Sequence, residues 1–179
     1  ALKLARQARD EDLRSSVPVL LALDLMSVKP EAETLVISYL KAPGAEVALR
    51  RGYAAALLSL QRYADAQAQL EIVTREHPQL PGPWLTLGAL QVEMRQPLDA
   101  EQSLQRFVSL MQAPTQTPTQ TPTQSQADPS AESDPQQGNL ADQSLTQAWL
   151  LLAQAAEQRG DYAAAEGWLA RVDNPQRAL

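Results

Sequence analysis

The sequence predicts an all-α protein, arranged as a right-handed superhelical solenoid of antiparallel helix pairs. The chain of 179 residues is rich in alanine, leucine and glutamine and only 4% aromatic, which is typical of helices. Ala32, Ala66 and Ala100 recur with a constant 34-residue period, and Ala165 follows after a longer interval. Such regular spacing indicates stacked copies of one helix pair, because a single pair cannot bury its apolar face alone.

The repeats follow one another without gaps over the first part of the chain. Residues 1–12 match the second helix of a repeat that is cut before the chain begins. Complete repeats are expected at 13–46, 47–80 and 81–112, each with two antiparallel helices. With a final pair near the C-terminus, these elements predict nine helices and no strands.

Several of these helices carry recognisable start signals. Proline or an acidic residue in the first turn suits the free N–H groups and the positive end of the helix dipole. Pro30 with Glu31, Pro97 with Asp99, and Asp161 after a glycine occupy such positions. They mark the start of the second helix in the first, third and last repeats.

Small side chains are expected where the two helices of a repeat cross. Helix axes approach to about 8–10 Å only when the side chains at the crossing point are small. The sequence places alanine or glycine at both sides of three such crossings: Ala54 with Ala66, Gly88 with Ala100, and Ala153 with Ala165.

An insertion displaces the last repeat. The sequence numbers of Trp84 and Trp149 differ by 65, which equals one 34-residue repeat and an insertion of 31. Segment 113–139 contains five prolines and no large apolar residue. We expect it to be disordered, because it cannot bury enough surface to offset its ordering entropy. The final repeat, 140–179, is expected to stack on the preceding one, since loop closure costs little more as a loop lengthens.

The repeats resemble the tetratricopeptide repeat (TPR) family, whose unit is a 34-residue pair of antiparallel helices. The resemblance implies that the tryptophans and tyrosines at family positions belong to the core. It is weakest in the first full repeat, where Ser16 and Leu20 replace the usual tryptophan and small residue. The positions that carry it are Ala54, Tyr63, Ala66, Leu70 and Pro78; Trp84, Leu87, Gly88, Ala100 and Leu104; and Trp149, Leu152, Gly160, Asp161, Tyr162, Ala165 and Leu169.

No pattern in the sequence points to catalysis, and we expect no enzyme, no cofactor and no metal site. His77 is the only histidine, there is no cysteine, and no glycine-rich phosphate loop or nucleophile elbow is present. His77 falls at the end of a second helix, where we expect it on the surface. The net charge of −6 makes nucleic acid a poor partner, and no apolar run is long enough to cross a membrane.

The TPR resemblance implies a partner-binding groove along the first helix of each repeat. Arg51 is its only basic residue and Ala55 stands where carboxylate-binding family members have asparagine, so we expect apolar docking of an extended segment or helix. Alternatively, neighbouring repeats cover part of this stripe. The groove positions are Val17, Leu21, Asp24, Leu25, Arg51, Ala55, Leu58, Ser59, Leu85, Ala89, Val92, Glu93, Leu150, Gln154, Glu157 and Gln158.

The segments "ARQARDEDLRSSVPVLLALDLM" and "AEQRGDYAAAEGWLARV" are also similar to periplasmic TPR lipoproteins of Gram-negative envelopes. That resemblance implies a scaffold that delivers substrates to a carboxyl-terminal processing protease, anchored at the outer membrane through residues preceding Ala1. The partner would then be a protein or peptide, including that protease. The alternatives are a cytoplasmic location and an architectural role in a secretion, pilus or envelope-assembly machine without peptide binding.

Overall fold

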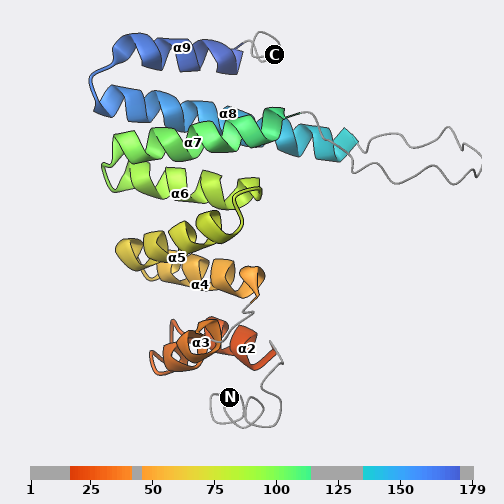
Figure 1. Ribbon diagram of the computed structural model, residues 1–179. Helices are drawn as coiled ribbons and strands as arrows, with labels where there is room; N and C mark the ends of the chain where they lie inside the picture. Colours follow the sequence, from red (N-terminus) through yellow and green to blue (C-terminus); the bar gives the residue numbers. More distant parts are fainter. Residues whose placement is uncertain (1–16, 42–45, 114–134, 174–179) are drawn as a thin grey trace, which may run out of the picture. The chain divides into compact units, whose positions relative to one another are not determined.

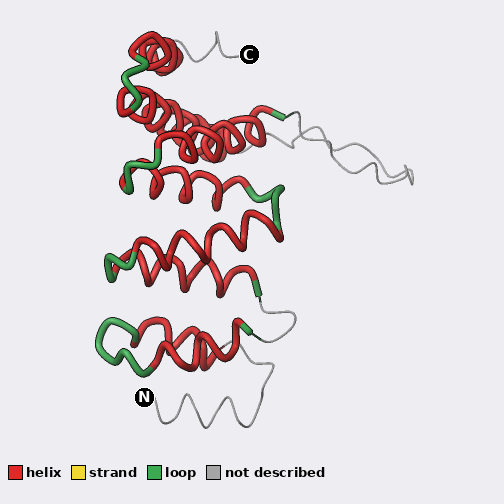
Figure 2. The backbone as a smooth tube through the Cα atoms, turned by 60° about the vertical axis from the view of Figure 1, so that its left-hand side comes forward, coloured by secondary structure: helices red, strands yellow, loops and turns green. Residues whose placement is uncertain are grey.

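The computed structural model describes residues 17–41, 46–113 and 135–173, and over these ranges the protein is entirely helical (Figures 1 and 2). The described residues form eight helices and no strand. The predicted all-α class is therefore confirmed. The helix expected within residues 1–12 lies outside the described residues. The chain divides into two compact units, Ala1–Leu90 and Gln91–Leu179, called here the N-terminal and C-terminal units.

The N-terminal unit contains two helix pairs and the start of a third. Helix α2 (Val17–Leu25) packs against α3 (Ala32–Leu40), and α4 (Val47–Ser59) packs against α5 (Tyr63–Glu76) (Figure 1). Helix α2 also contacts α4, so the first helices of successive pairs are neighbours. Helix α6 (Pro81–Glu93) begins in this unit and ends in the next.

The pair α4 and α5 has small side chains buried at the predicted positions. Ala54 and Ala66 are both buried, and the larger Leu57 and Leu70 are buried beside them in sequence. Each of these leucines lies three or four residues from its alanine, which places it on the same helix face. The interior of this pair therefore follows the apolar periodicity of the sequence.

The C-terminal unit contains α7 (Pro97–Gln112), α8 (Pro135–Gln158) and α9 (Tyr162–Asp173). Helix α8 packs against both α7 and α9. Ala153, Ala156 and Ala165 form a small core between α8 and α9, and Trp168 packs against it. Arg159, at the end of α8, pairs with Glu101 of α7, which ties the two helices together at this end.

Helix α8 begins earlier than the sequence suggested. The insertion was expected to continue to Asn139, but the helix starts at Pro135. Proline suits the first residue of a helix because its φ is already helical and the missing N–H has no helical partner at that position. The four residues that follow Pro135 include no second proline that would interrupt the helix. The insertion's residues 114–134 lie outside the described residues.

Two tyrosines expected in the core are on the surface, so that prediction was wrong. Tyr63 and Tyr162 are 43% and 70% exposed, whereas Trp149 is buried. Each tyrosine is the first residue of its helix, a full turn before the buried alanine at the crossing. Trp84 is half-buried, and its indole N–H donates to the Pro78 carbonyl at 3.1 Å.

Three helix pairs turn in the same way, and the turns repeat with the sequence period. Gln61, Arg95 and Gly160 have φ values of 59°, 59° and 77°, the left-handed conformation that ends many helices. Their spacing along the chain is the same as that of the buried alanines at the helix crossings. In each turn the next residue donates its N–H back across the helix end, as Arg62 does to the Leu57 carbonyl at 2.9 Å.

This geometry predicts that glycine stabilises each of these turns, so adding a glycine at one turn and removing the glycine at another should have opposite effects on stability. Replacing Gln61 by glycine should raise the free energy of unfolding by about 1 kcal/mol, because a Cβ is disfavoured in the left-handed region. Gly160→Ala should lower it by a similar amount, although no atom lies within 4 Å of the added methyl group. Urea unfolding of the variants measures both changes. Equal responses at the two turns would contradict the shared conformation.

Candidate functional site

The clearest candidate for a binding surface is a pair of hollows on either side of α4. Hollow A, of about 500 Å³, lies between α2 and α4. Hollow B, of about 410 Å³, lies between α4, α5 and the start of α6. Both hollows are within the N-terminal unit. We call the two together the α4 groove.

Hollow A has a largely apolar lining with polar groups at its rim. Most of its wall comes from leucine, methionine and alanine side chains, and Ser59 donates its hydroxyl to the Ala55 carbonyl at 3.1 Å. The acidic group in its lining is Asp24. The lining consists of Leu20, Leu23, Asp24, Met26, Ser27, Gly52, Ala55, Ala56, Ser59 and Leu60.

Hollow B has a basic residue in its lining, where hollow A has an acidic one. Arg51 is exposed at its edge, and the remaining lining is apolar or small except for Thr86. The Thr86 hydroxyl already donates to the Gly82 carbonyl at 3.1 Å. The lining consists of Ala48, Arg51, Gly52, Ala54, Ala55, Leu58, Leu70, Pro83 and Thr86.

Gly52 and Ala55 line both hollows, so the two hollows are neighbours on α4. A Cβ at residue 52 would lie 3.1 Å from Cδ1 of Leu23, a separation that would force the leucine to shift. Glycine therefore allows α2 to approach α4 closely at this point. Ala55 is exposed, and because its side chain is a single methyl group it protrudes little from the surface between the hollows.

The structure brings together part of the groove predicted from the sequence. Asp24, Ala55 and Ser59 line hollow A, while Arg51, Ala55 and Leu58 line hollow B. The predicted α2 residues Leu21 and Leu25, and the α6 residues Leu85 and Ala89, border neither hollow. Val17 is the first residue of α2, and its side chain is outside the part of the chain that the structure describes.

Sequence reasoning missed several groove residues. Leu20, Leu23 and Gly52 shape hollow A, and Pro83 and Thr86 form one side of hollow B. For Gly52 the sequence does contain a signal, because a glycine inside a helical pattern often marks a close approach of two chain segments.

In the C-terminal unit, one predicted groove residue is in the interior. Val92 is only 1% exposed, so its side chain offers no surface to a partner, and that assignment was wrong. Its carbonyl accepts a hydrogen bond from the Gln158 amide at 3.1 Å, which explains why this edge of α6 is covered. Glu93 is exposed, and Leu150, Gln154 and Glu157 form an exposed stripe on α8.

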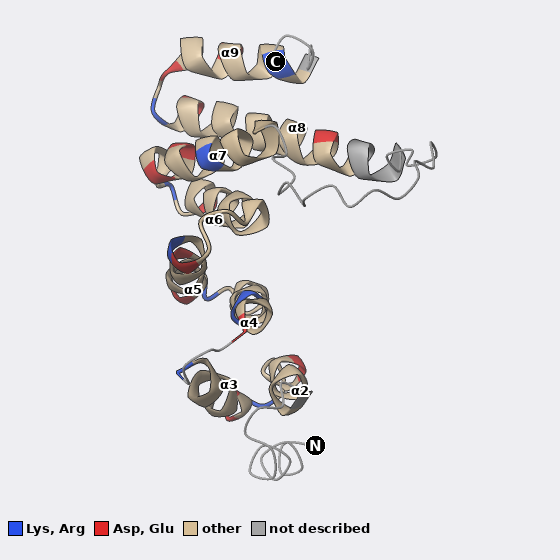
Figure 3. Cartoon of the chain, turned by 45° about the vertical axis from the view of Figure 1, so that its right-hand side comes forward, with Lys and Arg blue, Asp and Glu red and all other residues tan. Residues whose placement is uncertain are grey.

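Asp24 and Arg51 are available for interaction with a partner. Both side chains are exposed, and neither has a hydrogen-bond or ion-pair partner within the described parts of the chain. Basic and acidic residues are interspersed along the described helices rather than gathered in one block (Figure 3). His77 is exposed at the C-terminal cap of α5, as predicted.

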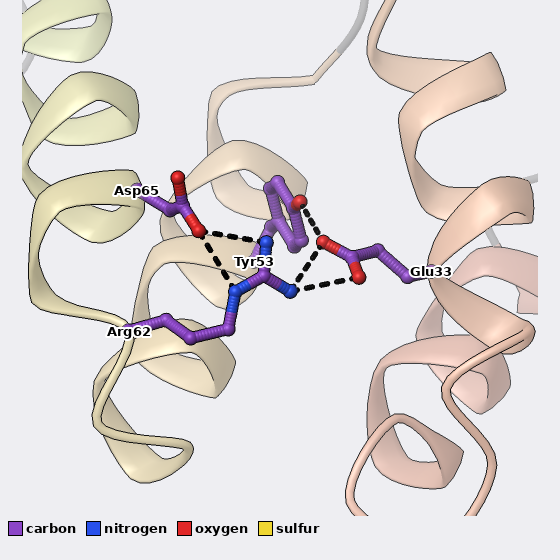
Figure 4. A network of polar contacts seen from close by, with 4 residues as sticks. All are labelled: Glu33, Tyr53, Arg62 and Asp65. Atoms are coloured by element: carbon purple, nitrogen blue, oxygen red, sulfur yellow. Dashed lines mark hydrogen bonds and ion pairs between the residues drawn. The ribbon is translucent and has the colours of Figure 1, made fainter.

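A polar network joins α3 to the α4–α5 pair (Figure 4). Arg62 lies in the turn before α5 and donates to both oxygens of Glu33, at 2.7 and 2.8 Å. It also contacts Asp65 at 2.7 Å. The buried Tyr53 of α4 donates its hydroxyl to Glu33 Oε1 at 2.6 Å. The network orients the groove helix α4 relative to α3.

The network shifts two titrating groups in opposite directions. The hydrogen bond from Arg62 lowers the pKa of Glu33 below its ordinary value of 4.5, and the bond from Tyr53 acts in the same direction. Burial raises the pKa of Tyr53 above its ordinary value of 10.0, and the hydrogen bond to Glu33 adds to this effect.

These shifts predict how the network's contribution to stability varies with pH. The contribution of Glu33 is complete above its ordinary pKa of 4.5 and is lost as the pH falls through its lowered folded value. The contribution of Tyr53 is complete below its ordinary pKa of 10.0 and is lost as the pH rises above that value. Urea unfolding measured from acidic to alkaline pH, on the unmodified protein and on Glu33→Gln, isolates the part of the pH dependence that comes from Glu33. Parallel curves for the two proteins would contradict the assignment.

The described residues contain no group of three histidine, cysteine or acidic side chains placed to hold a metal ion. None of the described helices combines the length and apolar character needed to cross a membrane. No protein-family model matches the chain, and a search of curated proteins finds no match. The α4 groove is therefore the feature of the described residues from which a function can be inferred.

Proposed function

We propose that this protein is a scaffold or adaptor that binds a peptide segment of a partner protein in the α4 groove. The observation that carries the proposal is a pair of largely apolar hollows that share lining residues on one helix. Each also has a charged residue in its lining, Asp24 or Arg51, with no partner among the described residues. Peptide segments dock in such grooves through apolar side chains, while polar groups at the rim set their orientation.

The finer architecture belongs to the same proposal. We infer that the helix pairs form a TPR-type array, a right-handed superhelical solenoid in which the first helix of each pair faces the partner. The left-handed turns at Gln61, Arg95 and Gly160 support this inference, because they recur with the spacing of the buried alanines. Delivery of substrates to a protease in the bacterial envelope is a narrower form of the proposal, which localisation of the protein in cells would test.

Filling the groove tests the proposed function. Ala55→Trp places a large side chain between the two hollows at an exposed position, so it should block docking without disturbing the core. The matched control is Ala68→Trp, an exposed alanine within α5 that lines neither hollow. Peptides selected from a displayed random library on the unmodified protein should bind Ala68→Trp normally.

The same peptides should bind Ala55→Trp at least about tenfold more weakly, a loss of about 1.4 kcal/mol. Isothermal titration calorimetry measures the affinities, and circular dichroism checks that both variants remain folded. If no selected peptide discriminates between the two tryptophan variants, the α4 groove is not the binding surface.

A further inference from the structure

The α4 groove has a direction, because the described residues that line its two hollows include one acidic side chain in one hollow and one basic side chain in the other. Asp24 lines hollow A and not hollow B, whereas Arg51 lines hollow B and not hollow A. Neither side chain has an ion-pair or hydrogen-bond partner among the residues that the structure describes. Some other charges of this unit are engaged with each other, as in the Arg62–Glu33 pair at 2.7 Å.

The apolar lining of the two hollows favours a partner with two apolar side chains. Leu20 and Leu23 offer accessible apolar surface in hollow A, and Leu58 does so in hollow B. Met26, Leu70 and Pro83 are buried residues of the walls. The low surface over Gly52 and Ala55 leaves room for a backbone to pass from one hollow to the other. A chain can therefore place one apolar side chain in each hollow.

We propose that the groove selects a peptide of defined charge order: an acidic residue beside Arg51, two apolar residues over the hollows, and a basic residue beside Asp24. This inference depends on the proposed function, because it names the partner of that same groove. Opposite charges in the two hollows favour one direction of the peptide over the other, since reversal would place like charges together. A single arginine without a second cation makes a free phosphate or nucleic acid a poorer match than a peptide of mixed charge.

A displayed random peptide library is the probe that tests this order. Selection on the unmodified protein should enrich peptides with an acidic and a basic residue on opposite sides of an apolar pair. Selection on the double variant Asp24→Lys, Arg51→Glu should enrich the reverse order. Each single charge reversal should weaken a peptide selected on the unmodified protein about two- to fivefold, the range for an exposed ion pair.

The controls separate this inference from the function on which it depends. Enriched apolar peptides with no preferred charge order, or an order unchanged in the double variant, would overturn the charge-order proposal and leave groove binding intact. Peptides that bind Ala55→Trp as well as the unmodified protein would overturn both. Self-association abolished by Ala55→Trp would identify a second copy of the chain as the occupant and overturn the proposal.

Two further measurements keep the test decisive. The discrimination between charge orders should shrink in high salt, because exposed charges are screened. If the double variant does not fold, Asp24→Asn and Arg51→Gln replace it. Each of these should remove the preference at its own end of the peptide only, and an unchanged preference would contradict the proposal.

Discussion

Replacing Leu152 by alanine is expected to lower the free energy of unfolding by about 2–5 kcal/mol, the range for a buried leucine truncated within a packed core. Leu152 is 1% exposed on α8, the helix that packs against both α7 and α9. The lost methyl groups would leave a cavity that the surrounding helices can close only in part. Urea unfolding followed by tryptophan fluorescence measures the change, because Trp149 lies one turn away and is buried.

Leu150 provides a matched control on the same helix. Its side chain is 47% exposed, so Leu150→Ala should change the free energy of unfolding by no more than about 0.5 kcal/mol. The two substitutions remove the same atoms at positions two residues apart, and only their burial differs. Similar losses for both would show that the buried face of α8 is assigned wrongly.

Removing Glu33 is expected to produce the second large effect, a loss of about 1–3 kcal/mol. The buried Tyr53 hydroxyl would lose the carboxylate to which it donates at 2.6 Å, and Arg62 would lose both of its contacts to that carboxylate. A buried donor without an acceptor carries the full cost of its desolvation. Glu33→Ala should therefore destabilise the N-terminal unit more than an ordinary surface substitution.

A double-mutant cycle with Tyr53→Phe assigns this loss to the network. The two changes should couple by about 0.5–3 kcal/mol, since phenylalanine removes the donor that Glu33→Ala leaves unpaired. Asp65→Ala is the control within the same network, because its ion pair with Arg62 is solvent-exposed and should contribute at most about 1 kcal/mol. Additive losses in the cycle would show that Tyr53 and Glu33 act independently.

The sequence was most informative about the interior of the helix pairs. Ala66, Ala100 and Ala165 are all buried, because a 34-residue period reports which helix face meets a neighbour. It was less informative about the ends of the elements. Tyr63 and Tyr162 were expected in the core from the TPR resemblance, but they are the first residues of their helices and face solvent. A pattern of residue types does not specify how the first turn is covered.

The candidate site was predictable only in outline. Arg51, Ala55 and Leu58 were expected in the groove from the TPR resemblance, and they line hollow B. The hollows themselves depend on how closely α2, α5 and α6 approach α4, which is a tertiary property that no local period encodes. Gly52 shows the difference: its role follows from the 3.1 Å that would separate a Cβ on its backbone from Cδ1 of Leu23.

The connection between α7 and α8 has a practical consequence. Helix α7 ends at Gln112 and α8 begins at Pro135, yet the two helices pack against each other. Both ends of the connection are therefore held by a shared interface, and changes in its length should alter the closure entropy only slowly. A fluorescent protein or epitope tag spliced between residues 113 and 135 would report on the protein in cells from a point far along the sequence from the α4 groove residues.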